Sequence, residues 1–103
     1  MKEAFVNAMV AAIEGGSEYW CEEIGFYNAE GKHMSYEDWF ETGKTIRVND
    51  GEDIHIETRG AFFANVERYF PDWKEMFSDE GDYDAGDADQ FLQLGVFGEV
   101  IFG

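Results

Sequence analysis

Basic residues are scarce in this sequence of 103 amino acids. Its 7 Lys and Arg stand against 23 Asp and Glu, which gives a formal net charge of −16 at pH 7. Phosphate backbones and anionic lipids repel a protein with this charge, which argues against direct binding to nucleic acid or to a membrane surface. The partners that such a surface attracts are cations and the basic surfaces of other proteins.

Cysteine, proline and long apolar runs are also scarce. Cys21 is the only cysteine, so no internal disulfide forms and we expect a reducing, cytoplasmic compartment. No apolar run approaches the roughly 18–20 residues of a membrane span, and the segment from Met1 to Val6 lacks the basic region and apolar run of a signal peptide. Pro71 is the only proline and no linker or repeat divides the chain, so we expect a single domain over residues 1–103.

Aromatic residues, in contrast, are abundant. The chain contains 10 Phe, 5 Tyr and 3 Trp, and 45% of its residues are hydrophobic. Acidic disordered segments are poor in aromatic residues and cannot bury enough apolar surface to fold. The composition therefore predicts a folded acidic domain with a small core.

Helical periodicity recurs in three long stretches, at residues 3–14, 61–78 and 88–98. Gly15-Gly16 predicts a left-handed stop after the first. Pro71 divides the second into pieces at 61–69 and 71–78, with Pro71 opening the second piece. Asp87 predicts the N-cap of the third, with Gln90 completing a capping box. Ser35 predicts the cap of one further helical turn over residues 35–40.

Alternating side chains predict three strands, at residues 19–27, 45–49 and 53–58. The last two form a hairpin around Asn49-Asp50-Gly51. Helices and a small antiparallel sheet in this order predict an α+β fold, with the helices packed on one face of the sheet. The apolar segment 100–102 at the end of the chain is expected to be buried, because an exposed apolar tail favours association.

The register of the hairpin follows from the pleat of the two strands. Pairing Val48 with Ile54 leaves a three-residue loop over residues 50–52. This register places the four aliphatic side chains of the two strands on one face. It also predicts that His55 lies on the outer face of its strand.

Catalytic and metal-binding patterns are weak. Cys21 with His33 or His55 is the only Cys/His set, and a core cysteine with two surface histidines is the favoured explanation, because no motif supports catalysis. The acidic segment 79–87 is rich in oxygen ligands, but an EF-hand frame started at Asp82 fails at three positions. No zinc spacing and no phosphate-binding glycine loop is present. We therefore predict no catalytic residue, no cofactor and no metal site, while cation binding by residues 79–87 stays open.

The acidic residues themselves are the strongest functional pattern. A net charge of −16 exceeds the roughly 2–8 charges that solubility requires of a small domain, although a solvated acidic surface is the simplest alternative. Carboxylates three or four residues apart on a helix, or two residues apart on a strand, lie roughly 5–7 Å apart, which is comparable to the spacing of phosphates, and the candidate rows are Asp72/Glu75/Asp79 and Asp53/Glu57. The predicted partner-binding residues are Asp72, Glu75, Asp79, Glu80, Asp82 and Asp84, together with Asp50, Glu52, Asp53 and Glu57.

Some aromatic and basic residues have an expected role beside these acids. Trp39 and Tyr83 are candidate anchors for a partner, although a position in the core is favoured for Trp39. The arginines at positions 47, 59 and 68 are expected to pair with local acids rather than to bind a partner.

Two stretches of the chain resemble small acidic proteins of bacteriophages and mobile elements: Glu14-Gly15-Gly16-Ser17-Glu18-Tyr19-Trp20-Cys21, and Asp87-Ala88-Asp89-Gln90 with Phe97-Gly98-Glu99-Val100-Ile101-Phe102-Gly103. That group includes anti-CRISPR and anti-restriction proteins, several of which mimic DNA. The dense negative charge predicts a non-enzymatic mimic of DNA that occupies a Lys/Arg-rich groove on a nucleic-acid-handling complex, and the resemblance favours a phage-type inhibitor; we take a CRISPR effector as the first candidate target. The alternative is an acidic interaction module that uses a hydrophobic surface, with a homodimer through its apolar C-terminal end as one form.

Overall fold

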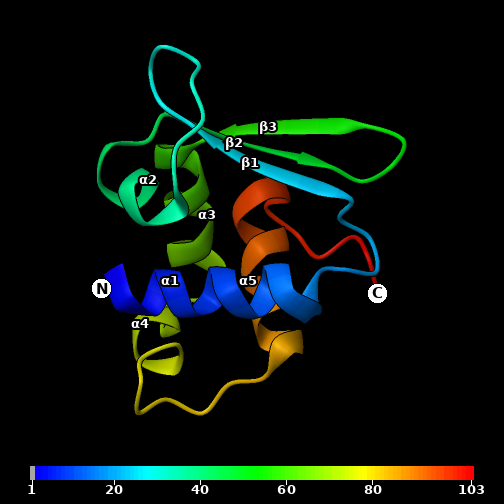
Figure 1. Cartoon of the computed structure of the whole chain (residues 1–103). Helices are drawn as coiled ribbons and strands as arrows, with labels where there is room; N and C mark the ends of the chain where they lie inside the picture. Colours follow the sequence, from blue (N-terminus) through cyan, green and yellow to red (C-terminus); the bar gives the residue numbers. More distant parts are fainter. Residues whose placement is uncertain (1) are drawn as a thin grey trace.

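A three-stranded antiparallel sheet carries the helices of this protein on one face, as the computed structural model of residues 2–103 shows (Figure 1). This arrangement confirms the α+β fold. The strands lie in the order β1-β2-β3. Their bounds are β1 Glu23–Tyr27, β2 Thr45–Asn49 and β3 Ile54–Thr58; those of the helices are α1 Lys2–Ala11, η1 Ala12–Gly16, α2 Tyr36–Thr42, α3 Arg59–Tyr69, α4 Trp73–Met76 and α5 Ala85–Phe97.

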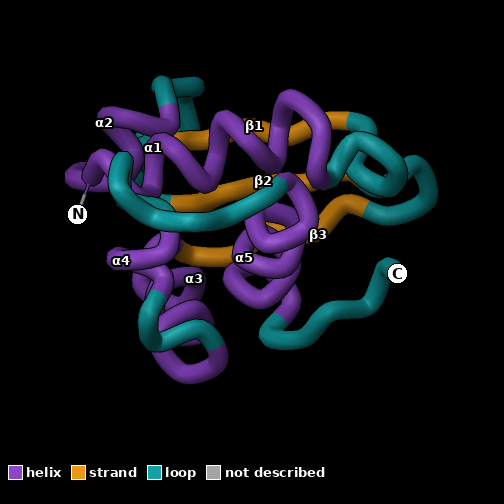
Figure 2. The backbone as a smooth tube through the Cα atoms, turned by 90° about the horizontal axis from the view of Figure 1, so that it is seen from below, coloured by secondary structure: helices purple, strands orange, loops and turns teal. Residues whose placement is uncertain are grey.

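The core lies between the helices and the inner face of the sheet, and Figure 2 shows the helical layer from below. Ile46 and Val48 of β2 are fully buried there. Phe5 of α1 is also fully buried, and its ring packs against those of Trp39 and Phe62 at centroid distances of 5.7 and 6.3 Å. Each large apolar side chain buried in this way contributes roughly 1.5–3 kcal/mol.

The first helix ends differently from the prediction. α1 gives way at Ala12 to a π-helical turn that runs through Gly16. Neither Gly15 nor Gly16 has a positive φ, and Ser17 after them has φ of −103°, so the expected left-handed glycine stop is wrong. A Cβ atom on Gly16 would lie 2.2 Å from the carbonyl oxygen of Ala85, which shows that glycine is needed there for close packing on the start of α5.

Proline and capping residues divide the remaining helices largely as predicted. The break at Pro71 is confirmed, although α4 begins only at Trp73, with Asp72 at its N-cap. Ser35 caps α2 and accepts a hydrogen bond from the Asp38 amide. The N-cap of α5 is Asp84 rather than Asp87, because Asp84 and Asp87 accept hydrogen bonds from each other's backbone amides in a complete capping box.

The first strand is shorter than predicted because the chain turns before it. The backbone amides of Trp20 and Cys21 donate to the carbonyl of Ser17, which excludes this segment from the sheet. Trp20 is nevertheless buried, so this apolar residue contributes to the core from a turn rather than from a strand.

The hairpin register differs from the prediction by one residue. Val48 lies opposite His55, and the loop spans the four residues 50–53. Ile54 and Ile56 are therefore on the outer face, 50% and 64% exposed, whereas His55 points inward and packs edge-on against Phe97. The predicted face of four aliphatic side chains is wrong.

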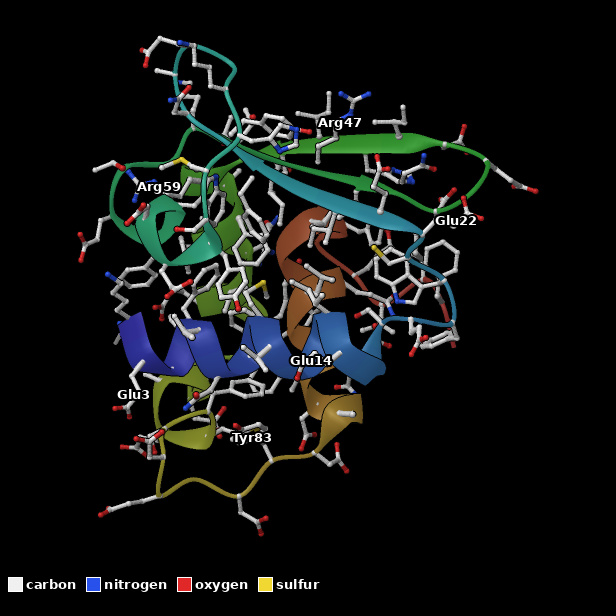
Figure 3. The ribbon with its side chains drawn as sticks, viewed as in Figure 1. Glu3, Glu14, Glu22, Arg47, Arg59 and Tyr83 are labelled. Atoms are coloured by element: carbon white, nitrogen blue, oxygen red, sulfur yellow. The ribbon has the colours of Figure 1, made fainter. Side chains whose placement is uncertain are left out.

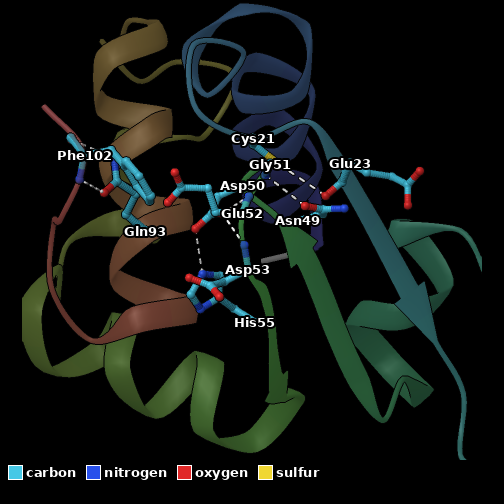
Figure 4. A network of polar contacts seen from close by, with 10 residues as sticks. All are labelled: Cys21, Glu23, Asn49, Asp50, Gly51, Glu52, Asp53, His55, Gln93 and Phe102. Atoms are coloured by element: carbon cyan, nitrogen blue, oxygen red, sulfur yellow. Dashed lines mark hydrogen bonds and ion pairs between the residues drawn. The ribbon is translucent and has the colours of Figure 1, made fainter.

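Polar bonds within the loop explain this register (Figure 4). One carboxylate oxygen of Asp50 accepts from the amides of Glu52 and Asp53, and the other lies 2.8 Å from Nε2 of His55. The side chain of Asn49 accepts from the amide of Gly51, whose φ is +97°. These local bonds favour the four-residue loop over the alignment of aliphatic side chains.

The C-terminal segment is only partly buried. Val100 and Ile101 are about half exposed, so their predicted burial is wrong. Phe102 stacks on Trp20 at a centroid distance of 4.8 Å. The side-chain oxygen of Gln93 accepts from the amides of Ile101 and Phe102, which fastens the tail to α5. Within the described chain, every helix is too short or too polar to cross a bilayer.

Candidate partner-binding surface

Nearly all acidic side chains lie at the surface. Of the 23 Asp and Glu, only Asp50, Glu57 and Asp87 are half-buried and only Asp89 is buried. Within residues 2–103, lysine pairs with glutamate just twice, in Lys2–Glu41 at 3.7 Å and Lys74–Glu67 at 3.3 Å. The surface therefore carries a large excess of negative charge that the protein itself does not neutralise.

The acids predicted around residues 72–84 gather at the lower end of the molecule in Figure 1, on α4 and on the loop that leads to α5. All six side chains are exposed. α4 ends at Met76, so Asp79 does not share a helix with Asp72 and Glu75. The predicted helical row of these three is wrong, and the acids instead follow an irregular path.

Glu3 belongs to the same group, although it is distant in the sequence. Its carboxylate accepts a hydrogen bond from the amide of Asp79 at 3.3 Å, and Asn7 of α1 donates to the Asp79 carboxylate at 3.0 Å. Figure 3 shows Glu3 at the lower end of the molecule. No local sequence signal could have identified Glu3, because packing of α1 against the loop places it there.

The hairpin acids divide between surface and interior. Glu52 and Asp53 are exposed at the tip, where the Glu22 carboxylate lies against Gly51. Glu57 is half-buried on the inner side and accepts from the amide of Thr58. Asp53 precedes the strand, so the predicted pair of carboxylates from Asp53 and Glu57 is not presented on one surface.

Asp50, one of the predicted contacts, has a structural role within the hairpin. The backbone amide of Asp53, then the side chain of His55 and the amide of Glu52, lower the pKa of its carboxyl to about 2. Its side chain is only 9% exposed.

The two predicted groups of acids lie at opposite ends of the molecule, with the hairpin tip above and the loop over residues 79–84 below (Figure 1).

A cleft of about 250 Å³ separates the π-helical turn from β1. Cys21 lies in it, half-buried, and burial raises the pKa of its thiol. The lining combines apolar side chains, including Ile13, Ile24 and Leu92, with four carboxylates, from Glu14, Glu18, Glu22 and Glu23. The sequence showed these acids as a charged run, and only the fold places them around one apolar depression.

The Cys/His set does not form a nucleophile–base pair. The Cys21 thiol lies 3.5 Å from the carbonyl of Glu23. His33 is exposed and its ring packs on Tyr27 at 4.5 Å, whereas His55 pairs with Asp50. Within residues 2–103, no three His, Cys, Asp or Glu side chains are placed to share one metal ion.

Asp89 of α5 connects the turn after η1 with α5 and the C-terminal tail. Its carboxylate accepts hydrogen bonds from Ser17 at 2.8 Å, Tyr19 at 2.7 Å, Trp20 Nε1 at 2.6 Å and Gln93 at 3.0 Å. Burial, followed by the bond to Asp89, raises the pKa of the Tyr19 phenol. The Asp89 carboxylate therefore has all its hydrogen-bond donors within the protein. These bonds hold α5 and the C-terminal tail against the turn after η1.

The candidate anchors and arginines also have internal roles. Trp39 is fully buried and donates to the carbonyl of Thr45, as its favoured core position predicted, and Tyr83 is half-buried against Phe77. Arg59 donates to the carbonyls of Phe40 and Gly43, while Arg68 lies over the ring of Tyr69.

Arg47 projects from the outer face of the sheet (Figure 3). Among the described residues, none of the three arginines forms an ion pair, so their expected pairing with acids is wrong.

No protein-family model matches the chain, and neither does any curated protein or solved structure.

Proposed function

We propose that this protein is a non-enzymatic inhibitor of a bacterial nucleic-acid-handling defence complex, with a CRISPR effector as the first target to test. It acts as an acidic mimic of DNA and occupies a groove lined by Lys and Arg. The observation that carries the proposal is the exposed, largely unpaired negative charge, which extends from the hairpin tip to the loop over residues 79–84.

The density of this charge is close to that of a DNA duplex. The longest dimension of the molecule is 35 Å and its net charge is −16. Duplex DNA of the same length carries about 20 phosphate charges, at one per roughly 1.7 Å of axis. A groove that binds DNA through its phosphates therefore meets a similar number of negative charges on this protein.

The lower acidic group is the proposed main contact. We define it as Glu3, Asp79, Glu80, Asp82 and Asp84, which are all exposed. Carboxylates accept paired hydrogen bonds from arginine in the geometry that phosphates also use. The resemblance of residues 14–21, 87–90 and 97–103 to small acidic phage proteins supports an inhibitor of host defence.

Affinity capture tests the proposal. The purified protein is immobilised, exposed to a bacterial lysate that contains CRISPR and restriction complexes, and washed through a salt gradient. We expect a nucleic-acid-binding complex to be retained, released between about 50 and 500 mM salt because exposed charges are screened, and displaced by added duplex DNA. Retention that resists both salt and DNA would contradict mimicry.

Matched variants locate the contact. Asp79→Asn, Glu80→Gln, Asp82→Asn and Asp84→Asn together remove four charges, and Asn at position 84 preserves the helix cap. The control removes four exposed charges from the segment around α2 through Glu30→Gln, Glu37→Gln, Asp38→Asn and Glu41→Gln. Loss of capture with the first variant alone supports the lower acidic group, whereas equal losses indicate charge attraction without a defined face.

A second candidate function has its own observation. Val100 and Ile101 at the C-terminal end and Ile54 and Ile56 on the sheet are exposed aliphatic side chains. An interaction module that uses these hydrophobic surfaces would bind its partner almost independently of salt, since apolar contacts are not screened. The same capture experiment therefore separates the two proposals.

A further inference from the structure

β3 forms one edge of the sheet, because the strand order is β1-β2-β3. The Asp50 amide donates to the Asp53 carbonyl and the Arg59 amide donates to the Lys44 carbonyl, which fixes the alternation of ladder bonds on either side of β3. His55 and Glu57 share that alternation and bond to β2. The backbone groups of Ile54 and Ile56 consequently point toward the open edge.

The next amide along this edge already has a partner. Thr58 donates to the carboxylate of Glu57 at 2.9 Å. Ile54 and Ile56 thus present two successive N–H and C=O pairs about 6.6–6.8 Å apart, which is the repeat of an antiparallel partner strand.

The side chains of the same two residues cover the outer face of the sheet beside this edge. Ile54 and Ile56 are 50% and 64% exposed, and no helix of the described chain lies over that face (Figure 1). Edge strands of soluble proteins usually carry lysine, proline or a bulge that prevents pairing. β3 carries none of these; its one charged side chain, Glu57, is half-buried on the inner side and bonds to the Thr58 amide, so the edge at Ile54 and Ile56 is suited to accept another strand.

The charge near the open edge of β3 determines which kind of strand binds there. Glu52 and Asp53 are exposed at one end of the edge, and Glu22 lies beside the same turn. A second copy of this protein would bring another 16 negative charges to the contact. Arg47 lies opposite Ile56 on β2, so a segment with Lys or Arg gains attraction at the other end of the edge, beside Glu52 and Asp53.

We infer that β3 receives an extended, basic segment of the partner as a fourth strand. The backbone of the segment bonds with Ile54 and Ile56, its apolar side chains pack on the two isoleucines, and its cationic side chains lie near Glu52 and Asp53. The inference rests on the proposed function, since it assigns the segment to the basic target of the inhibitor and names a second contact, separate from the lower acidic group.

Amide exchange and chemical-shift mapping of the full-length protein test the inference. The probe is the synthetic peptide acetyl-Lys-Val-Lys-Val-Thr-Val-Lys-amide, and the control replaces its central Val with Pro. With the first peptide we expect shift changes centred on β3 and at least tenfold slower exchange of the Ile54 and Ile56 amides. The proline peptide, which has the same charge, leaves both amides unprotected.

Three variants separate backbone pairing from other effects. Ile56→Pro removes an N–H that faces the open edge and leaves the bonds to β2 in place, so it abolishes the protection of the remaining Ile54 amide. Ile56→Thr retains the N–H and weakens binding only several-fold. If Ile56→Pro fails to fold, the double variant Ile54→Lys/Ile56→Lys, which changes only exposed side chains, still repels the basic peptide and abolishes its binding.

The outcomes distinguish this inference from the proposed function. Equal binding of both peptides, with shifts spread over residues 79–84, would overturn strand addition and leave DNA mimicry intact. Protection of Ile54 and Ile56 that rises with protein concentration alone would identify a second copy as the occupant and also overturn the inference. Protection by the first peptide, combined with failure to capture any complex displaced by DNA, would contradict the proposed function but not strand addition at β3.

Discussion

Asp50 and Asp89 are the two carboxylates of this acidic chain that serve the fold most directly. Asp50 accepts two backbone amides and the His55 side chain within the hairpin. Asp89 is 6% exposed and accepts four side-chain hydrogen bonds. Asp89 satisfies buried donors that would otherwise lose their partners, whereas Asp50 orders the exposed hairpin loop.

The Asp89 network predicts a large loss of stability on truncation. Asp89→Ala leaves several buried donors without an acceptor, at about 1–3 kcal/mol each, and we expect a total loss of about 3–5 kcal/mol. Urea unfolding followed by circular dichroism measures it. The control, Asp82→Ala on the exposed loop, should change stability by less than about 0.5 kcal/mol. Equal effects of the two substitutions would contradict the structural role of Asp89.

The lowered pKa of Asp50 predicts a pH dependence. Its pKa falls from an ordinary value of about 3.9 to about 2 in the folded protein. The unfolded chain therefore binds more protons between these values, and stability from this group decreases as the pH falls from about 4 to 2. We expect the stability difference between the wild type and Asp50→Asn to be constant above pH 5 and to shrink below pH 4. A pH-independent difference would contradict the prediction.

Residue identity alone could not separate these carboxylates from the surface acids. Asp50 stood among the predicted contacts because nothing in a single sequence shows that its side chain turns back onto the loop. The capping position of Asp84 was equally hidden, since Asp84 and Asp87 each begin a plausible cap and the fold selects the earlier one. The hydrogen bonds in the structure distinguish the structural roles of Asp50 and Asp84, which the amino-acid sequence alone does not.

At the scale of elements, local signals predicted helices better than strand register. Periodicity found α3 and α5, and Pro71 marked the break before α4. The register of β2 and β3 depended on a loop held by Asp50 and His55, which outweighed the alternation of aliphatic residues. The expected outward position of His55 was wrong for the same reason.

Two helical glycines give a matched prediction about packing. A Cβ at Gly95 would lie 2.2 Å from the ring of Phe62, which is fully buried, whereas a Cβ at Gly60 meets nothing within 4 Å. We expect Gly95→Ala to destabilise by about 1–3 kcal/mol and Gly60→Ala to stabilise by about 0.4–1 kcal/mol. Thermal unfolding of both variants checks this pair, and stabilisation by Gly95→Ala would contradict the close contact between α5 and α3.

At the scale of the whole molecule, composition predicted an acidic folded domain and the order of periodic segments correctly predicted an α+β fold, but neither predicted how the acids are placed. The lower acidic group depends on contacts between α1 and residue 79, and the cleft acids depend on the turn before β1. Both arise from packing between segments distant in sequence, which a single sequence does not reveal.

The net charge also predicts a salt effect on stability. Like charges oppose compaction, and salt shortens the screening length from about 30 Å at 0.01 M to about 10 Å at 0.1 M. We therefore expect the melting temperature to rise by several degrees between these concentrations. The variant with Asp79, Glu80, Asp82 and Asp84 changed to amides should show a smaller rise. A melting temperature that falls with salt would indicate that ion pairs dominate instead.

Competition with DNA for one purified target tests the central claim most directly. The affinity of the captured complex for a labelled duplex is measured at increasing concentrations of this protein, at low and at moderate salt. DNA mimicry predicts that the apparent dissociation constant for DNA rises linearly with protein concentration, without a ternary complex, and that the effect weakens as salt increases. A complex that holds DNA and this protein together would contradict the claim.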